Sequence, residues 1–219
     1  MIITIDGPAG SGKSTVADII ANQLGFVHFN SGSLFRAITA HLYEQNFDIE
    51  NITTDSTIPN FDLKVEIIDD LQHVFVDGID YTPVLRDNHI STLVANVALN
   101  KSCRKKTSEC QHSFCSKNNV VIEGRDIGSH VFPNAEYKFY LDCSIEERAR
   151  RRFKEEHAKG TDVTLEEIIE QIAERDYLDK TREIAPLVVP ENAIIIDSTN
   201  LSIEEVVNEL TSHINIHKI

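Results

Sequence analysis

The sequence is poor in several residue types, and each shortage argues against a class of protein. Its 219 residues include no tryptophan, one methionine and four cysteines. Cys103, Cys110, Cys115 and Cys143 show neither a CxxC spacing nor another zinc-binding pattern, so a disulfide scaffold or a zinc site is not expected. No segment approaches the roughly 20 apolar residues needed to cross a bilayer. We therefore expect no membrane partner.

Positive charge is also scarce. The 21 basic residues are outnumbered by 35 acidic ones, which gives a formal net charge of −14. Because general binding to DNA or RNA needs a positive surface, we expect no nucleic-acid partner. The first ten residues, MIITIDGPAG, lack the basic and apolar regions of a signal peptide. These features predict a cytoplasmic protein, and the absence of a coiled-coil pattern or apolar stripe predicts a monomer.

Short β-branched runs alternate with segments of helical periodicity. The predicted strands are 2–5, 26–29, 120–122, 137–141 and 193–196, and the predicted helices are 13–24, 33–43, 145–157, 165–180 and 203–214, with further helices within 86–117. This alternation predicts an α/β fold with a parallel sheet covered on both faces. Between about 60 and 84, alternating apolar residues and the turn dipeptide Asp77-Gly78 predict a small antiparallel insert.

The most specific motif follows the first predicted strand. Its residues are Gly7-Pro8-Ala9-Gly10-Ser11-Gly12-Lys13-Ser14, which fit G-x-x-x-x-G-K-[ST]. Glycines let the backbone wrap around a phosphate with its N–H groups pointing inward, and the next helix adds positive partial charge. Lys13 can reach the β- and γ-phosphates, and the Ser14 hydroxyl can bind Mg²⁺. The motif predicts a nucleoside triphosphate site without fixing the reaction.

A second segment, 146–156, combines arginines with glutamates. If it is helical, Arg148, Arg151 and Arg152 are spaced i, i+3 and i+4 and share one face. Ion pairs with the nearby glutamates would make this an ordinary surface helix. Alternatively, the helix is a lid whose arginines stabilise charge on a phosphoryl group during transfer. The residues alone allow both interpretations.

Polar residues also form a row further along the chain. Arg175, Asp179 and Arg182 are spaced i, i+4 and i+7, so they fall on one face of the predicted helix 165–180 and its end. Salt bridges along the helix are one interpretation. The other is a row facing a nucleotide, with arginine for phosphate and aspartate for sugar hydroxyls.

A loop at 123–126 follows the predicted strand 120–122 directly. In open parallel sheets, ligands bind beyond the carboxyl ends of the strands. Arg125 and Asp126 in this loop are therefore candidate ligand-binding residues. A structural ion pair within the loop is the alternative.

Together these motifs resemble bacterial cytidylate kinases. The resemblance includes the phosphate loop, Ser31-Gly32 followed by Arg36, GRDIG at 124–128, FPNAEYKFYLDCSIEERARRR, ERDYLDKTREIAPL and Asp197-Ser198-Thr199. It runs in order from about Ile2 to the last predicted helix. It implies a P-loop nucleoside monophosphate kinase fold and ATP-dependent phosphorylation of CMP and dCMP, with Mg²⁺.

The resemblance also implies roles for single residues. Gly7 to Thr15 would hold the ATP phosphates. The acceptor monophosphate would be held by Ser31, Arg36, Arg125 and Arg182. Arg104 and Asp126 would contact the cytosine, and Asp179 the ribose hydroxyls. Arg151, Arg152 and Arg175 would act on the transferring phosphate together with Lys13.

The implied organisation has three parts. A core phosphate-loop domain comprises residues 1–30, 118–143 and 186–219. A monophosphate-binding region covers 31–117 and contains the antiparallel insert. A lid with its following helix covers 144–185.

The chain departs from the family pattern at four positions. Ala95 stands where a serine usually helps to read the base, which removes one hydrogen bond worth about 0.5–1.5 kcal/mol. Asn30 and Glu123 stand where the family usually has aspartate, and Phe35 where it usually has tyrosine.

Other functions remain as alternatives. Within P-loop kinases, the acceptor could be AMP, UMP or a non-nucleotide such as shikimate. A GTPase switch needs N-K-x-D, and the Asn-Lys pair at Asn100 lacks that aspartate. An ATP-dependent regulatory binding module is a further alternative from another class.

Overall fold

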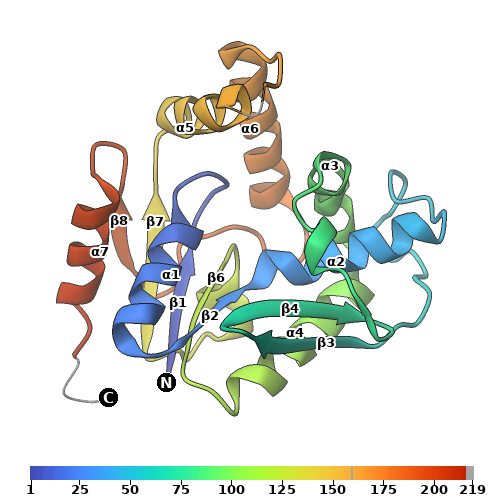
Figure 1. Cartoon of the computed structure of the whole chain (residues 1–219), viewed down its shortest axis with the longest axis horizontal. Coiled ribbons are helices and arrows are strands. Elements are labelled where there is room, and N and C mark those ends of the chain that lie inside the picture. Colours follow the sequence, from blue (N-terminus) through green and yellow to red (C-terminus); the bar gives the residue numbers. More distant parts are fainter. Residues whose placement is uncertain (159, 216–219) are drawn as a thin grey trace.

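The computed structural model describes residues 1–158 and 160–215 as an α/β protein. Its central sheet has five strands in the order β2-β6-β1-β7-β8, all paired in parallel. The strands are β1 (Ile2–Asp6), β2 (Val27–Asn30), β6 (Val120–Gly124), β7 (Tyr137–Asp142) and β8 (Ile194–Asp197). The predicted parallel sheet is confirmed, and this arrangement places all carboxyl ends at one edge (Figure 1).

Helices cover both faces of this sheet, as the sequence predicts. On one face, α1 (Lys13–Leu24) and α7 (Ile203–Ser212) pack over strand residues that include Ile3, Ile5 and Val121. On the other, α2 (Ser31–Glu44) and α4 (Lys101–Cys115) cover residues that include Val120 and Ile122. Successive side chains of a strand point to opposite faces, so a continuous apolar run such as 120–122 supplies both cores.

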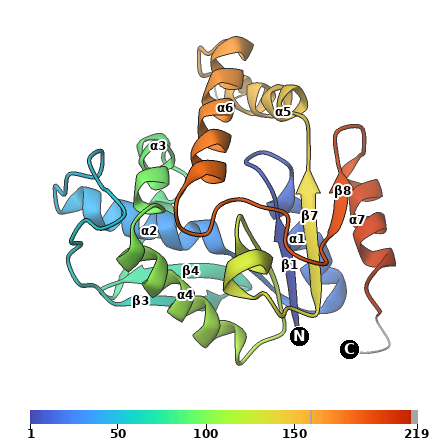
Figure 2. The same ribbon diagram turned by 180° about the vertical axis from the view of Figure 1, so that it is seen from behind.

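The predicted insert is a separate three-stranded antiparallel sheet. It consists of β3 (Leu63–Ile68), β4 (Leu71–Val76) and β5 (Ile79–Asp80). Val74 and Val76 are fully buried and join the core beneath α2. A 3₁₀ turn, η1 (Thr82–Val84), and α3 (Asn88–Val97) lead back to α4. The insert therefore lies beside α2, as both ribbon views show (Figures 1 and 2).

Two helices stand above the carboxyl edge of the sheet. They are α5 (Ile145–Ala158), which follows β7, and α6 (Leu165–Thr181) (Figure 2). Their own small core consists of Ala149, Ile168 and Ile172 with partly buried neighbours. This core is separate from the two cores that cover the faces of the sheet. No helix in the described part of the chain is long and apolar enough to span a bilayer.

Candidate active site

The phosphate loop joins β1 to α1 at the carboxyl edge of the sheet. Gly7 adopts φ 148°, and a Cβ at this position would overlap the Leu141 carbonyl of the neighbouring strand. Gly12 caps α1 in the left-handed region, with φ 92°. Glycine tolerates the close approach at position 7 and the left-handed backbone at position 12, because it has no Cβ. The resulting turn can point its backbone N–H groups toward a phosphate.

Lys13 lies inside this loop rather than at its surface. Its ammonium donates to the Pro8 carbonyl at 2.5 Å and to Ser11 Oγ at 3.3 Å, and the residue is only 4% exposed. Burial lowers the pKa of Lys13 to about 7, and the positive charge of Arg125 acts in the same direction. Nearby carboxylates of Glu123 and Asp6 oppose the shift only in part. An anionic ligand in the loop would restore the charged form.

Glu123 is a functional candidate that the sequence did not single out as a site residue. Its carboxylate accepts from the Ser14 hydroxyl and, at 2.7 Å, from Asn30 Nδ2. His28 Nε2 lies 3.8 Å from the same oxygen, Oε1. Burial alone would raise the pKa of Glu123, but the contact with His28, the charge of Lys13 and the Ser14 bond hold it below its ordinary value. An ionised carboxylate thus stands beside the predicted Mg²⁺ ligand.

Asp6 ties the phosphate loop to the loop after β6. Its carboxylate accepts from the amides of Ile127 at 2.9 Å and Gly128 at 2.7 Å. Both amides belong to η2 (Ile127–Val131), which follows Arg125 and Asp126 directly. Burial raises the pKa of Asp6 to about 6 against the opposing effect of these hydrogen bonds. Asp6, at the end of β1, therefore holds the 125–126 loop in a defined position beside the phosphate loop.

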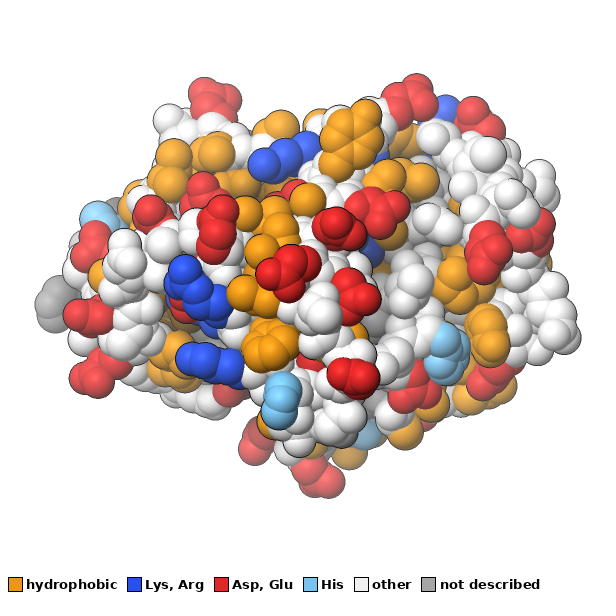
Figure 3. Space-filling view, turned by 90° about the horizontal axis from the view of Figure 1, so that it is seen from above, with side chains coloured by type: hydrophobic (Ala, Val, Ile, Leu, Met, Phe, Trp, Pro, Cys, Tyr) orange, Lys and Arg blue, Asp and Glu red, His pale blue; other side chains and the backbone are white. Residues whose placement is uncertain are grey.

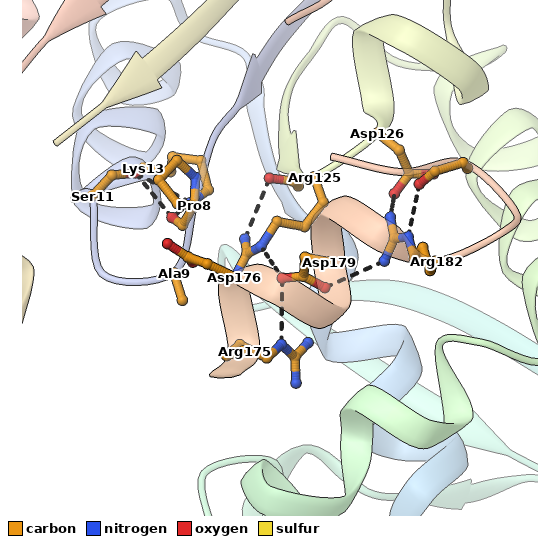
Figure 4. A network of polar contacts seen from close by, with 12 residues as sticks. Pro8, Ala9, Ser11, Lys13, Arg125, Asp126, Arg175, Asp176, Asp179 and Arg182 are labelled. Atoms are coloured by element: carbon orange, nitrogen blue, oxygen red, sulfur yellow. Dashed lines mark hydrogen bonds and ion pairs between the residues drawn. The ribbon is translucent and has the colours of Figure 1, made fainter. Parts of the chain in front are cut away.

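Asp179 is the centre of a cluster of guanidinium groups (Figure 4). One carboxylate oxygen accepts from Arg125 Nε at 3.0 Å and from Arg175 Nε at 3.3 Å, and the other accepts from Arg182 Nη1 at 3.4 Å. Burial opposes ionisation, but the charges of Arg125, Arg175 and Arg182 hold the pKa of Asp179 below its ordinary value. Residues from α6 and from the loop after β6 thus meet at one point.

Asp126 extends this cluster toward α4. Its carboxylate accepts from Arg182 Nη2 at 2.8 Å and from Arg104 Nη2 at 2.5 Å. Arg104 also donates to the Ala98 carbonyl at 3.0 Å, and its guanidinium lies 5.6 Å from the Phe35 ring centroid. A cavity of about 300 Å³ opens beside this pair, with Ser31, Phe35, Arg104 and Asp126 among its walls. The arrangement offers charged donors and acceptors beside an aromatic ring.

Two arginines near the cluster have no carboxylate partner. Arg36 on α2 and the exposed Arg86 form no ion pair with any residue that the structure describes. Burial lowers the pKa of Arg36, and the positive charges of Arg125, Arg175 and Arg86 act in the same direction. A buried guanidinium that lacks a carboxylate partner is a suitable ligand for an anion such as a phosphate. Arg86 was not among the predicted site residues.

The lid arginines, predicted as one row, differ in their surroundings. Arg151 donates to the Ser198 carbonyl at 2.8 Å and to Glu147 at 3.1 Å, and its guanidinium borders Gly12 of the phosphate loop. Arg152 is exposed and has no ion pair within the described residues. Arg148 is buried and bonded to Asp176. Arg148 therefore packs α5 against α6, whereas Arg151 lies beside the phosphate loop and Arg152 is exposed to solvent.

The buried arginines of the site contrast with the acidic surface above them. On the face that carries the lid helices, acidic side chains are spread widely and basic ones are few (Figure 3). The site arginines lie in the interior of the same region, and Arg182 and Arg104 are each 8% exposed. Among the described residues, no group of three His, Cys, Asp or Glu side chains is arranged to hold a metal ion.

Comparisons with known proteins give a consistent result. Residues 3–216 match the family model described as cytidylate kinase. A cytidylate kinase of Carboxydothermus hydrogenoformans is 44% identical over 211 residues, which are 96% of this chain and 95% of the relative. A cytidylate kinase of Bacillus subtilis is 43% identical over 209 residues, 95% of this chain and 93% of the relative.

Solved structures support the fold at lower identity. The crystal structure of TT1252 from Thermus thermophilus aligns with a TM-score of 0.51 and 14% identity, over 98% of each chain. An uncharacterized protein from Eubacterium ventriosum aligns with a TM-score of 0.50 and 13% identity, over 97% of each chain. These two likenesses concern the arrangement of helices and strands alone.

Proposed function

The chain belongs to the cytidylate kinase family, and we propose that it transfers the γ-phosphoryl group of ATP to CMP and dCMP. The products would be ADP with CDP or dCDP. The observation that supports this proposal is the meeting of Arg125 and Arg175 at one oxygen of Asp179, at 3.0 and 3.3 Å, in a protein whose phosphate loop encloses the buried Lys13. A phosphate loop accounts for the donor, and a separate group of guanidiniums accounts for a second phosphate.

The reaction itself needs no strong general base. The acceptor oxygen of a phosphate monoester is already anionic near neutral pH. It attacks Pγ as the bond between Pγ and the β–γ bridging oxygen breaks, and ADP leaves with the electron pair. The protein's task is therefore to align the two nucleotides and to neutralise charge. This agrees with a site composed of arginines, one lysine and positioned backbone amides.

On the donor side, residues 7–15 would wrap the ATP phosphates. Lys13 would leave the Pro8 carbonyl for the β- and γ-phosphates, and its charge would follow the migrating group. Mg²⁺, brought with ATP, would be bound by the Ser14 hydroxyl, and Glu123 would hold a water of that ion. A hard cation with few protein ligands and several waters is the usual state of Mg²⁺ in such sites.

On the acceptor side, Ser31, Arg36, Arg125 and Arg182 would hold the monophosphate. Ser31 is already oriented, because its hydroxyl donates to the Glu123 carbonyl at 2.6 Å. Asp179 would exchange arginine contacts for the ribose hydroxyls. Arg104 and Asp126 would contact the cytosine in the cavity beside Phe35.

The lid would complete the site when both nucleotides are bound. Arg151 and Arg152 on α5, with Arg175 on α6, would approach the transferring phosphoryl group. Closure of this region excludes water, which would otherwise hydrolyse ATP. We assign the lid to 144–185, the monophosphate-binding region to 31–117, and the core to 1–30, 118–143 and 186–219. The four cysteines are free thiols, which suits a protein of the reducing cytoplasm. We propose that the protein is a monomer and that its partners are small-molecule substrates, without nucleic acid or membrane.

An ATP-coupled assay with CMP, dCMP, UMP and AMP as acceptors tests the proposal. We expect the highest kcat/KM with CMP and dCMP, and negligible ADP release without an acceptor. Arg36→Ala should reduce kcat/KM for CMP by at least about 100-fold while the thermal transition persists, since it removes a charged phosphate ligand. Preference for AMP, for a non-nucleotide acceptor, or for acceptor-independent GTP hydrolysis would overturn it.

A further inference from the structure

The cavity beside Arg104 extends further along α4 than the two predicted base-contacting residues require. Its walls include Phe35, Arg104 and Asp126 at one end and Thr107, Gln111 and Val131 further along the helix. Arg104 and Gln111 are seven residues apart, so both project from one face of α4. Their Cα atoms are separated by roughly 10 Å along the axis, at about 1.5 Å per residue. At that spacing, the side chains of Arg104 and Gln111 can contact opposite ends of a single ring bound in the cavity.

Each of these side chains carries a buried polar atom without a partner. Arg104 Nε and Gln111 Oε1 have no hydrogen-bond partner among the described residues. Gln111 is only 1% exposed, so bulk solvent does not satisfy its amide oxygen. A buried acceptor left unpaired destabilises the fold, and an apolar residue of similar size would avoid that cost. The pair is therefore better explained by a ligand that supplies one acceptor and one donor.

The Watson–Crick edge of cytosine has this pattern. N3 and O2 accept hydrogen bonds, and the 4-amino group donates two. Arg104 Nε can donate to the accepting atoms, while Asp126 can receive one amino hydrogen. The second amino hydrogen needs another acceptor, and Ala95, at the position where the family usually has a serine, has no polar side-chain atom. Gln111 lines the same cavity, and its Oε1 is a buried acceptor with no partner among the described residues.

We propose that Gln111 is a specificity-determining residue, whose Oε1 accepts a hydrogen bond from the 4-amino group of cytosine. This rests on the proposed function, because it assumes that CMP occupies the cavity. In the orientation that the structure shows, Gln111 buries Oε1 without a partner among the described residues. Uracil has an accepting O4 where cytosine has its amino group, so UMP would set a second acceptor against Gln111 Oε1. Gln111 would thus supply discrimination that Ala95 cannot.

The test is the ratio of kcat/KM for CMP to that for UMP. Gln111→Met removes the amide at nearly constant volume, and we expect the ratio to fall about three- to tenfold, which corresponds to one neutral hydrogen bond. Thr107→Val is the matched control, because Thr107 lines the same cavity but its hydroxyl is already bonded to the Arg104 carbonyl at 2.9 Å. The control should leave the ratio unchanged. An unchanged ratio in a folded Gln111→Met protein would overturn the proposal.

A second substrate separates recognition from packing. The monophosphate of 2-pyrimidinone riboside lacks the 4-amino group, so it should bind wild-type enzyme more weakly than CMP. In Gln111→Met, that difference in equilibrium binding should shrink by the same factor as the CMP/UMP ratio. A purely structural glutamine would weaken both ligands equally. If Gln111→Met does not fold, Gln111→Glu keeps the acceptor, and its ratio should not fall; a lower ratio would refute the assignment.

Failure of the proposed function would look different. In that case wild-type protein would neither bind nor phosphorylate CMP, whereas failure of the Gln111 assignment leaves CMP kinase activity intact and alters only the comparison of bases.

Discussion

Arg148 and Asp176 form a bidentate ion pair that joins the two helices of the lid. Nη1 donates to one carboxylate oxygen at 3.2 Å, and Nη2 donates to the other at 2.7 Å. The same guanidinium donates to the Ala9 carbonyl at 3.1 Å and to the Cys143 carbonyl at 2.9 Å. One side chain therefore connects α5, α6, the end of β7 and the phosphate loop. It therefore holds α5 and α6 against the phosphate loop.

Arg148→Lys should destabilise the protein and reduce activity together. Lysine keeps the charge but cannot make the planar double contact with Asp176 or reach both carbonyls. Disrupting a buried pair costs about 3–5 kcal/mol, so we expect a clearly lower Tm and a fall in kcat with ATP. Arg150→Ala is the control, because Arg150 is exposed on the same helix and its pair with Glu147 contributes little. Equal effects of the two variants would contradict this assignment.

Glu123→Gln should change the response to Mg²⁺ more than the affinity for CMP. Glutamine keeps the size and can still accept from Asn30, but it removes the charge beside Ser14. We expect the Mg²⁺ concentration for half-maximal activity to rise about tenfold or more, because a water of a divalent cation binds a neutral amide less strongly. Titrating Mg²⁺ at saturating ATP and CMP measures this. An unaltered Mg²⁺ requirement would exclude Glu123 from the metal environment.

Gln72, on β4 of the antiparallel insert, connects that insert to the start of α2. Its amide oxygen accepts from the backbone N–H of Asn30 at 2.7 Å. Its amide nitrogen donates to the backbone carbonyl of Asn30 at 3.2 Å and to Ser33 Oγ at 2.7 Å. These contacts hold the start of α2, which carries Ser31 and Arg36. Gln72→Leu leaves the Asn30 amide without this partner, at about 1–3 kcal/mol.

We therefore expect Gln72→Leu to raise KM for CMP several-fold, with a smaller change in KM for ATP. His73→Ala is a suitable control, since His73 lies on the same strand and pairs with Asp80 on the neighbouring one. Initial-rate kinetics with each substrate varied would measure both constants. If KM for ATP rose as much as KM for CMP, Gln72 would be a general stability residue and not a positioning residue.

Stability of the nucleotide-free protein should rise with pH through the range in which Lys13 loses its proton. Burial lowers its pKa from 10.5 to about 7. Below pH 7 both states are protonated, and the cost of the buried charge is fully present. Between the two values the unfolded chain holds a proton that the folded chain has lost, so the free energy of unfolding increases by up to about 1.4 kcal/mol per pH unit from this group.

Urea unfolding of wild type and Lys13→Met between pH 7 and 9 isolates the contribution of this lysine. The wild-type curve should be steeper with pH, because methionine has no titrating group, while other residues contribute equally to both. ATP should reduce the wild-type slope, since its phosphates favour the charged lysine. Parallel curves for the two proteins would show that Lys13 keeps an ordinary pKa in the folded state.

The sequence by itself determined the α/β alternation and the phosphate loop, because both depend on local patterns. A β-branched run, a glycine-rich turn and a helical period lie within a few dozen residues of one another. The antiparallel insert was also predictable, since its alternation and its Asp77-Gly78 turn are contiguous.

Tertiary structure alone decided which polar residues share a partner. Arg148 and Arg151 look equivalent in sequence, yet Arg148 is buried against Asp176 and Arg151 borders the phosphate loop. Gln111 has no local pattern that marks it, and its unpaired oxygen is defined only by the cavity around it. Hydrogen bonds between residues far apart in the chain depend on how elements pack, and packing is a property of the whole fold.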